Sequence, residues 1–359
     1  MKAAVLKSFG SALVIEDVPE PVLGTGEVIV DVVATRVLSY SKEVFSGERK
    51  YALDLPVIPG AGGVGRVRAI GPDATKLSVG DWVLCDPTVR SRDDAIAPDI
   101  HLQGVSARGD GGMRLQKYFH HGSFAERMRV PTENVTRLGQ LSDAEATQWT
   151  VLGTMLVPYG GFLAAKLQPG ETVLVSGATG NFGSAAVAVA LAMGAACVVA
   201  PGRNEKMLAE LVRRHGARVR PVKLTGNEND DRELMKRAAP GPIDCAFDIM
   251  PPSVATTVVR AAIMTVRPNG RVVLMGGVNM QGGPGLELPY NWIMRDCITI
   301  HGVWMYPRDA AARLIAMVRA GLLRLEEYET TAFDLDHANE AVEHAAANGG
   351  PFKLTVIRP

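Results

Sequence analysis

Residues 173–194 read VLVSGATGNFGSAAVAVALAMG, and this stretch decides the class of the fold. An apolar run enters a glycine-rich turn, and small apolar residues then continue over a length typical of a helix. A turn in this setting can bind the pyrophosphate of a dinucleotide, because the helix N-terminus presents N–H groups and a positive dipole. A turn with a purely structural role is the alternative. The residues expected to bind the cofactor are Gly177, Ala178, Thr179, Gly180, Asn181, Phe182 and Gly183.

A second glycine-rich run, GAGGVG at residues 60–65, matches the pattern G-x-G-x-x-G letter for letter. It follows Pro56 and Pro59 and leads into RVRAIGPD, a strand-like run that Gly71 and Pro72 end. No helix is expected to begin there, so the structural context of a dinucleotide fingerprint is missing. We interpret this match as an accident of composition.

The pattern around the turn predicts two domains. Between residues 155 and 305, apolar strands alternate with helical segments, which is typical of a doubly wound parallel sheet. Residues 1–154 carry short β-rich runs separated by turns, which predict a mostly antiparallel, barrel-like domain. Residues 306–359 predict two helices, at 309–320 and 336–348, and a last strand. Because these elements cannot bury a core alone, we expect them to fold back onto the first domain.

Composition excludes several functional classes. The chain has 359 residues with 38 Lys plus Arg and 38 Asp plus Glu, so no net basic field attracts a nucleic acid. Its four cysteines lie far apart without a C-x-x-C pair, which favours free thiols in a reducing compartment. Charges interrupt the N-terminal segment before any long apolar run forms. We expect a cytoplasmic protein without a signal peptide or membrane span, and with no nucleic-acid or membrane partner.

The choice of cofactor depends on the end of the second strand, at residues 200–206. Roughly 20 residues after the glycine turn, an NAD site usually places a carboxylate on the ribose 2′-hydroxyl. The residues before Arg203 offer no carboxylate, whereas Arg203 itself, with Lys206 as a second candidate, can bind a 2′-phosphate. We therefore expect NADP (NADPH) as the cofactor. The alternative is that Arg203 is a solvated cation at the start of a helix.

Several segments follow one another along the chain: EVIVDVVAT, VIPGAGGVGRVRAIG with VGDWV, GSFAERMRVPTENV, GATGNFG, GRVVLMGG and DLDHANEAVEH followed by FKLTVIRP. Their order resembles the medium-chain dehydrogenase/reductase (MDR) superfamily over nearly the whole chain. The resemblance implies an α/β protein in which a GroES-like β-barrel catalytic domain, residues 1–154 and 306–359, is interrupted by a Rossmann domain, residues 155–305. It also implies an active site in the cleft between the domains and a homodimer whose sheet continues through ITIHGVWM.

Zinc-dependent members of this superfamily hold a catalytic zinc ion with three side chains, whose positions correspond here to Leu38, Ala61 and Gly153. None of these residues has a sulfur, imidazole or carboxylate donor. Gly62 takes the place of the glutamate that lies beside the metal in zinc-dependent members, and residues 88–121, which correspond to the structural zinc lobe, contain no cysteine. The chain therefore resembles zinc-independent members of the quinone oxidoreductase type, and no metal site is expected.

Without a metal, hydrogen-bond donors have to stabilise the negative charge that develops on a carbonyl oxygen during hydride transfer. Ser39 and Tyr40 follow the vacated Leu38 position. In zinc-dependent relatives the position of Tyr40 usually holds the hydroxyl that relays the alcohol proton. We expect Tyr40 and Ser39 to be the catalytic donors. The alternatives are that Tyr40 packs against the nicotinamide or the barrel and that Ser39 binds the cofactor.

Two other groups of side chains are assigned structural roles. His120 and His121, with His101 or Asp99, could form a different metal site, but a surface loop with solvated imidazoles is the simpler interpretation. Tyr159 precedes the glycine turn and is expected to pack rather than to catalyse.

These features predict an NADPH-dependent oxidoreductase that transfers hydride without zinc to a quinone, an enone or another activated carbonyl. Conjugated acceptors spread the developing charge over several atoms, so they need less stabilisation from the protein. A metal-free alcohol dehydrogenase or ketone reductase and a non-catalytic NADPH-binding module are the alternatives. Substrate specificity is expected to depend on the loop 88–121 and on residues around Trp304 and Tyr306.

Overall fold

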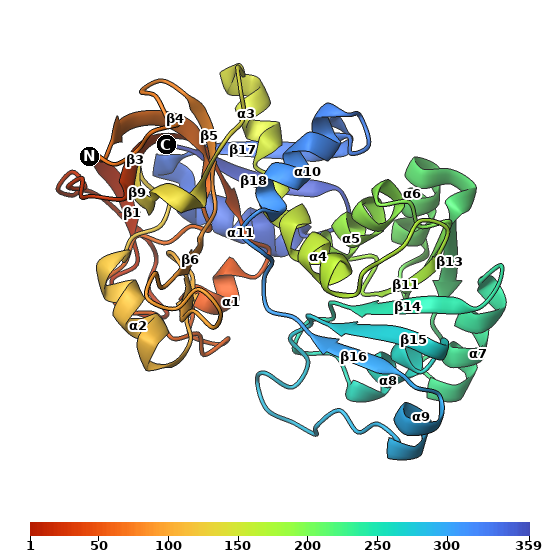
Figure 1. The fold of residues 1–359 in the computed structure, drawn as a ribbon. Coiled ribbons are helices and arrows are strands. Elements are labelled where there is room, and N and C mark those ends of the chain that lie inside the picture. The colour runs from red at the N-terminus through yellow and green to blue at the C-terminus, as the bar shows by residue number, and fades with distance from the viewer. The chain divides into compact units, whose positions relative to one another are not determined.

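The computed structural model describes all residues from Met1 to Pro359, and the chain divides into two compact units (Figure 1). The second unit comprises Thr154–Arg324 and Gly350–Phe352. The first unit comprises Met1–Gly153, Leu325–Gly349 and Lys353–Pro359, so it is assembled from both ends of the chain. None of the helices is both long and apolar enough to cross a membrane.

A six-stranded parallel sheet forms the centre of the second unit. In spatial order its strands are β13 (Val219–Lys223), β12 (Cys197–Gly202), β11 (Thr172–Ser176), β14 (Ile243–Asp248), β15 (Val266–Leu274) and β16 (Thr299–Gly302). The chain order runs outwards from β11 on one side and from β14 on the other, so the two halves of the sheet meet between these strands. This is the predicted doubly wound arrangement, and ligands of such sheets bind at the carboxyl ends of the strands where the halves meet.

Helices cover both faces of this sheet. They are α4 (Leu152–Ala164), α5 (Asn181–Ala192), α6 (Glu205–His215), α7 (Glu228–Ala238), α8 (Thr256–Ile263), α9 (Tyr290–Arg295) and α10 (Ala310–Arg319). Figure 1 shows α5 and α6 on one face and α7 and α8 on the other. α6 and α7 begin at asparagine caps, because the side-chain oxygens of Asn204 and Asn227 accept hydrogen bonds from first-turn backbone N–H groups.

The central strands of the second unit, β11, β12 and β14, are apolar because both of their faces are covered. All five residues of β11 are buried, and Leu174 packs with Val199 of β12 and Val272 of β15 in one core. Val259 and Ile263 of α8 complete this core from one side. Burial of apolar surface at this centre fixes the sheet and therefore the position of the glycine turn that follows β11.

The first unit is built on a mainly antiparallel sheet. In spatial order its strands are β10 (Val135–Arg137), β5 (Trp82–Cys85), β4 (Gly63–Ile70), β3 (Glu27–Val37), β18 (Lys353–Arg358) and β17 (Glu329–Asp334), and β9 (Arg127–Pro131) also pairs with β3. Only the pair β17 and β18 is parallel. The last strand lies between β3 and β17, so the end of the chain folds back onto the first unit as predicted.

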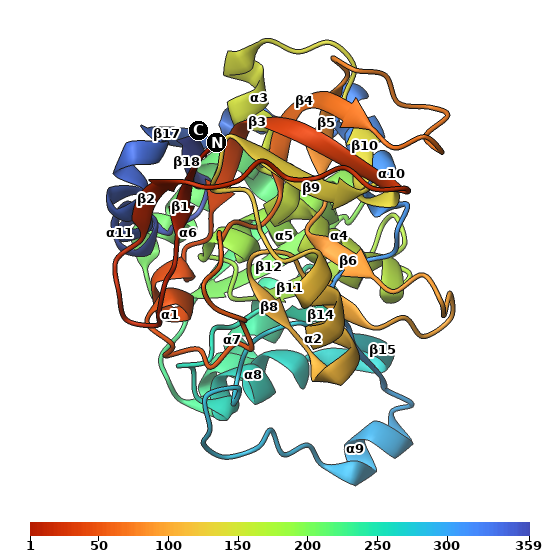
Figure 2. The same cartoon turned by 90° about the vertical axis from the view of Figure 1, so that its left-hand side faces the viewer.

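Shorter elements complete the first unit. They are the pair β1 (Lys2–Val5) and β2 (Val14–Asp17), the three-stranded sheet β6 (Thr88–Arg90), β7 (Ile100–Leu102) and β8 (Ser106–Ala107), and the helices α1 (Ser41–Phe45), α2 (Gly109–Tyr118), α3 (Asp143–Trp149) and α11 (Ala338–Asn348). Figure 2 shows α2 beside β8. The expectation of a loop at 88–121 is therefore wrong. Its strands have only two or three residues, too few for an alternating pattern to reveal them.

The chain returns to the first unit later than the sequence suggested. Residues 306–324, expected in the barrel-like domain, belong to the second unit. They pack against α4, where the lack of a side chain at Gly160 gives room to Tyr306, since a Cβ on Gly160 would lie 2.6 Å from the Tyr306 Cβ. The start of this segment is therefore held against α4, and the boundary lies after Arg324 instead of after residue 305.

Candidate functional site

The glycine turn lies where the two halves of the parallel sheet meet. β11 ends at Ser176, the turn follows, and α5 begins at Asn181 with Gly180 as its N-cap. No side chain caps this helix, and the first N–H groups of a helix have no partner within it. The turn therefore presents backbone donors and the positive end of the α5 dipole at the place where a pyrophosphate binds in this fold.

Two glycines of the turn are required by its geometry. Gly177 has a φ of 91°, a left-handed conformation that side chains other than glycine rarely adopt. A Cβ on Gly183 would lie 1.8 Å from the carbonyl oxygen of Gly177, so only glycine allows the first turn of α5 to approach so closely. Ala178 is fully buried, whereas Thr179, Gly180, Asn181 and Phe182 are partly exposed. The predicted turn residues thus divide into a packed base and an accessible rim.

Arg203 lies at the end of the neighbouring strand, close to this rim. β12 ends at Gly202, and a Cβ on Gly202 would lie 2.6 Å from Cγ2 of Thr179, so the strand end touches the turn. Arg203 is the next residue and is exposed, as is Lys206. The turn and Arg203, the cation predicted to bind a 2′-phosphate, therefore lie at the carboxyl ends of two neighbouring strands of the second unit. Pro201 and Gly202 extend β12 beyond its predicted end at Ala200.

Asp248 lies beneath the turn and was not marked by any sequence motif. It ends β14 and pairs in register with Ser176, the last residue of β11. Its side chain is 3% exposed, and burial raises its pKa to about 6, an effect that the Ser176 side chain and the Met250 backbone partly offset. A Cβ on Gly276 would lie 2.4 Å from Oδ2 of Asp248. A carboxyl group that titrates near neutral pH therefore lies at the junction of the two half-sheets.

The three positions that the resemblance assigns to zinc ligands hold residues without a donor for a metal ion. Leu38 and Ala61 are buried and apolar, and Gly153 has no side chain. No cluster of three or more His, Cys, Asp or Glu side chains anywhere in the structure is placed to hold a metal ion. Since zinc needs sulfur, nitrogen or oxygen donors, this set of residues does not fit zinc.

A buried arginine lies at the third of these positions. A Cβ on Gly153 would lie 2.5 Å from Nε, 2.8 Å from Cζ and 3.0 Å from Nη2 of Arg36. Arg36 belongs to β3, pairs in register with Val356 of β18 and is only 6% exposed. The guanidinium therefore occupies the space that any side chain at Gly153 would need. The sequence does contain a signal for this arginine. Arg36 stands two residues before Leu38, and alternate residues of a strand lie on the same face, so Arg36 could be expected on the same side as Leu38.

Ser39 and Tyr40, the predicted catalytic donors, follow β3 and are partly exposed. The guanidinium of Arg49 lies 4.0 Å from the centroid of the Tyr40 ring, and the Tyr51 ring meets it edge-on with a centroid distance of 6.4 Å. Burial raises the pKa of Tyr40 well above its usual value, and Arg36 and Arg49 offset part of this effect. The structure thus places Tyr40 within the electrostatic reach of Arg36, and its phenol stays protonated at neutral pH.

The run GAGGVG serves the packing of the first unit. Gly62 has a φ of 68°, and a Cβ on it would lie 2.2 Å from the carbonyl oxygen of Cys85. The hydroxyls of Thr35 and Ser123 donate to the Gly62 carbonyl oxygen over 2.9 and 2.8 Å. The run leads directly into β4, so no helix follows it, as predicted. Its glycines allow close contact between backbones rather than binding of a dinucleotide.

The histidines and Tyr159 have structural surroundings. The imidazoles of His120 and His121 are held by the backbone of 56–58: Nε2 of His120 lies 2.9 Å from the Pro56 carbonyl oxygen, and Nδ1 of His121 accepts from the Ile58 N–H over 3.2 Å. His121 is exposed and His120 is partly exposed, as expected for solvated imidazoles at the surface. His101 is fully buried, and burial lowers its pKa to about 4. Tyr159 is 5% exposed, which agrees with a packing role.

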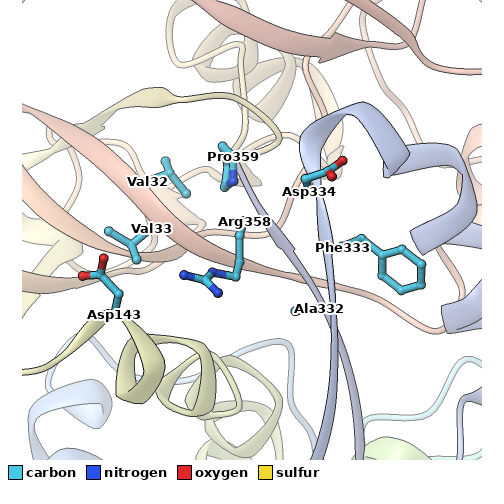
Figure 3. A pocket seen from close by; sticks show the side chains of 8 residues that line it. All are labelled: Val32, Val33, Asp143, Ala332, Phe333, Asp334, Arg358 and Pro359. Atoms are coloured by element: carbon cyan, nitrogen blue, oxygen red, sulfur yellow. The ribbon is translucent and has the colours of Figure 1, made fainter.

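One pocket of about 500 Å³ lies on the first unit, away from all predicted site residues. Figure 3 shows Arg358 between Val33 and Ala332, and the Phe333 ring directed away from it. The two carboxylates that line the pocket already have partners, since Asp143 pairs with Arg66 and Asp334 pairs with His337. We assign this pocket no role in catalysis. Its lining consists of Val32, Val33, Asp143, Ala332, Phe333, Asp334, Arg358 and Pro359.

Comparisons with known proteins match the two structural units in the same order. Residues 24–140 match the family model described as alcohol dehydrogenase GroES-like domain, and residues 182–320 match the model described as zinc-binding dehydrogenase. The crystal structure of the alcohol dehydrogenase from Aeropyrum pernix is similar over 100% of both chains, with a TM-score of 0.80 and 22% identity. At this identity the structural match establishes the fold alone.

Two relatives differ in their names and in their coverage. An alcohol dehydrogenase of Rhizobium meliloti is 34% identical over 219 residues, which cover 59% of this chain and 62% of that protein. An acryloyl-coenzyme A reductase of Metallosphaera sedula is 28% identical over 341 residues, which cover 92% of this chain and 94% of that protein. The two family models and the doubly wound sheet support an oxidoreductase of the alcohol dehydrogenase type, similar in both units to the medium-chain dehydrogenase/reductase superfamily.

Proposed function

We propose that this protein is an NADPH-dependent reductase that acts without zinc on a quinone, an enone or another activated carbonyl. One observation carries the proposal: the positions that would bind zinc hold Leu38, Ala61 and Gly153, and the Arg36 guanidinium fills the space beside Gly153. A divalent cation has no ligands there, and a buried positive charge would repel it. The chemistry then depends on side chains of the protein and on an acceptor that delocalises charge.

The second unit has the residues that would hold the cofactor. The turn from Gly177 to Gly183 fits the pyrophosphate, because its rim is accessible and α5 begins there. Arg203 is exposed at the end of β12 and would bind the 2′-phosphate, with Lys206 available on the next helix. Bound NADPH would supply the hydride.

The first unit has the donors that would act on the substrate. Tyr40 remains a neutral phenol, because burial raises its pKa, and it can donate a hydrogen bond to an oxygen that gains negative charge. Ser39 lies next to it and is partly exposed, so it is a second donor. The name of the acryloyl-coenzyme A reductase relative supports a conjugated thioester or enone as the class of acceptor.

A metal-free alcohol dehydrogenase or ketone reductase is the second candidate function, and it is favoured by the relative from Rhizobium meliloti that is named alcohol dehydrogenase. An energetic argument speaks against this second candidate. Reduction of a simple ketone forms an alkoxide with localised negative charge, which needs more stabilisation than an enolate does. A module that binds NADPH without turnover is a third candidate.

Steady-state oxidation of NADPH with a panel of quinones, enones, enoyl thioesters and simple ketones separates these candidates. We expect turnover with conjugated acceptors, little or none with simple ketones, and no loss of activity after dialysis against a chelator. Preferred turnover of simple ketones or alcohols would establish the second candidate. Saturable NADPH binding without turnover of any compound would establish the third.

A further inference from the structure

We propose that Arg36 is a substrate-binding residue whose guanidinium takes the place of the metal ion and binds the substrate oxygen on which negative charge develops. The proposal deepens the proposed function and rests on it, because it assigns the electrophile of a zinc-independent reductase. The substrates that fit such a cation carry a carbonyl oxygen conjugated to a carbon–carbon double bond, or an oxygen that is already anionic.

The position of Arg36 is the first argument. Its guanidinium lies against Gly153, the third of the vacated zinc positions, so close that it would have to shift to admit a side chain there. Leu38, the first of these positions, follows two residues later in the chain. The positive charge is therefore located where a zinc-dependent enzyme would concentrate it.

The surroundings of the guanidinium are the second argument. Arg36 is 6% exposed, and in such a poorly solvated place an arginine attracts an anionic oxygen more strongly than it would in water. Its electrostatic effect reaches Tyr40, because it is one of the two cations that favour the phenolate of that residue. One cation and the neighbouring Tyr40 hydroxyl therefore act on the same region of the first unit.

The chemistry of arginine is the third argument. A guanidinium remains charged at every physiological pH and presents several N–H donors in one plane, so it can bind a carbonyl or enolate oxygen without a change of protonation. In the reduction the substrate gains a hydride with its electron pair at the β carbon and a proton at the α carbon. Between these two additions the negative charge lies on the carbonyl oxygen, where Arg36 would stabilise it.

A binding experiment tests the cation independently of turnover. Propanoate and propanamide have nearly the same shape, but only propanoate carries a negative charge on oxygen. In titration calorimetry of the protein with NADP, we expect propanoate to bind about tenfold or more tightly than propanamide, a difference of about 1.4 kcal/mol. Arg36→Met should remove the preference and Arg36→Lys should retain part of it. Equal binding of the two probes to the wild-type protein would overturn the proposal.

A kinetic experiment tests the role of Arg36 in reduction. With the best conjugated acceptor, Arg36→Met should lower kcat/KM about 100-fold or more, the loss seen when one donor to a developing oxyanion is removed, and leave the Kd of NADPH unchanged. Guanidinium ions should restore part of the activity of Arg36→Ala, which a purely structural role would not produce. Arg127→Met is the matched control, since it removes an arginine of the same unit that pairs with Asp31.

The outcomes distinguish this proposal from the proposed function. If no acceptor is turned over but propanoate is preferred, the anion site stands and the reductase function fails. If conjugated acceptors are reduced but Arg36→Met retains wild-type kcat/KM, the function stands and the proposal for Arg36 is wrong. Should Arg36→Met fail to fold, the comparison of the two probes on the wild-type protein and on Arg36→Lys still decides the question.

Discussion

The guanidinium of Arg36 and the missing side chain of Gly153 are complementary, because a Cβ at residue 153 would lie 2.5 Å from Nε of Arg36. Neither position can change alone without a steric conflict or an unfilled space. The two residues therefore constrain each other within the first unit.

Zinc binding is expected to be absent and difficult to restore. We expect the wild-type protein to contain no stoichiometric zinc, and the same result for the triple variant Leu38→Cys, Ala61→His, Gly153→Cys, because Arg36 blocks the third ligand and repels a cation. Adding Arg36→Gly to the triple variant should allow zinc to bind. Elemental analysis after dialysis measures all three proteins. One tightly held zinc ion per wild-type chain would contradict the prediction.

Arg203 is expected to determine the choice between the two nicotinamide cofactors. NADPH should bind at least about tenfold more tightly than NADH, a difference of about 1.4 kcal/mol. Arg203→Ala should weaken NADPH binding by about one to three kcal/mol, the scale of a lost charged hydrogen bond, and leave NADH binding nearly unchanged. Fluorescence titration of both cofactors checks this. The control is Arg213→Ala, an exposed arginine of α6 paired with Glu210, and a mutant that loses both cofactors alike would show that Arg203 does not read the phosphate.

Gly183 is expected to be indispensable for the turn. In Gly183→Ala the new Cβ would lie 1.8 Å from the Gly177 carbonyl oxygen, so the turn or α5 has to move. We expect NADPH binding to weaken by more than about tenfold, with a loss of roughly 2 kcal/mol or more in the free energy of unfolding. Urea unfolding and cofactor titration measure both effects. Gly241→Ala is the matched control, because no atom lies within 4 Å of its added Cβ, and equal behaviour of the two variants would refute the prediction.

Asp248 is expected to make stability depend on pH between 4 and 7. Its pKa is raised by burial from 3.8 to about 6, so the folded state favours the protonated form. This contribution is fully present below pH 4 and is lost as the pH rises through about 6, by at most about 3 kcal/mol. Relative to Asp248→Asn, the wild-type protein should therefore become less stable from pH 4.5 to pH 7 in urea unfolding. The variant Asp93→Asn, which changes an exposed aspartate, should follow the wild-type curve.

We also propose that the protein is a homodimer in which the sheet of the second unit continues through β16. β16 is the edge strand of that sheet, and two of its four residues are exposed, so its outer backbone groups are available for pairing. Sedimentation at micromolar concentration should give the mass of two chains. Hydrogen exchange at Thr299–Gly302 should become faster on dilution. A monomer whose exchange does not depend on concentration would rule out this dimer.

The parallel sheet could be predicted from the sequence because its central strands are buried on both faces and several of its helices are long. The strands β11, β12 and β14 correspond to apolar runs, and the turn from Gly177 to Gly183 lies between a strand and a helix as expected. β17 could not be predicted, since five of the six residues between Glu329 and Asp334 are polar or small and none is buried. β17 takes its place in the sheet by pairing with β18, about 24 residues later in the chain, and no local sequence pattern reveals such a pairing.

The candidate site was predictable only in part, for a similar reason. The vacated zinc positions follow from the alignment of short motifs, but the contact between Arg36 and Gly153 joins residues more than a hundred positions apart. Asp248 was missed because its raised pKa arises from burial by neighbouring strands, not from a motif. Local patterns therefore identified where chemistry could occur, while the charges that act there required the tertiary structure.

The central place of β18 in the first sheet has a consequence for synthesis on the ribosome. β18 pairs with both β3 and β17, and its residues are translated after the whole second unit. Strand β3 is synthesised more than 300 residues before β18, so its part that pairs with β18, Thr35–Val37, lacks this partner until then. The nascent chain therefore has to keep this half-built sheet from aggregating until β18 has left the exit tunnel.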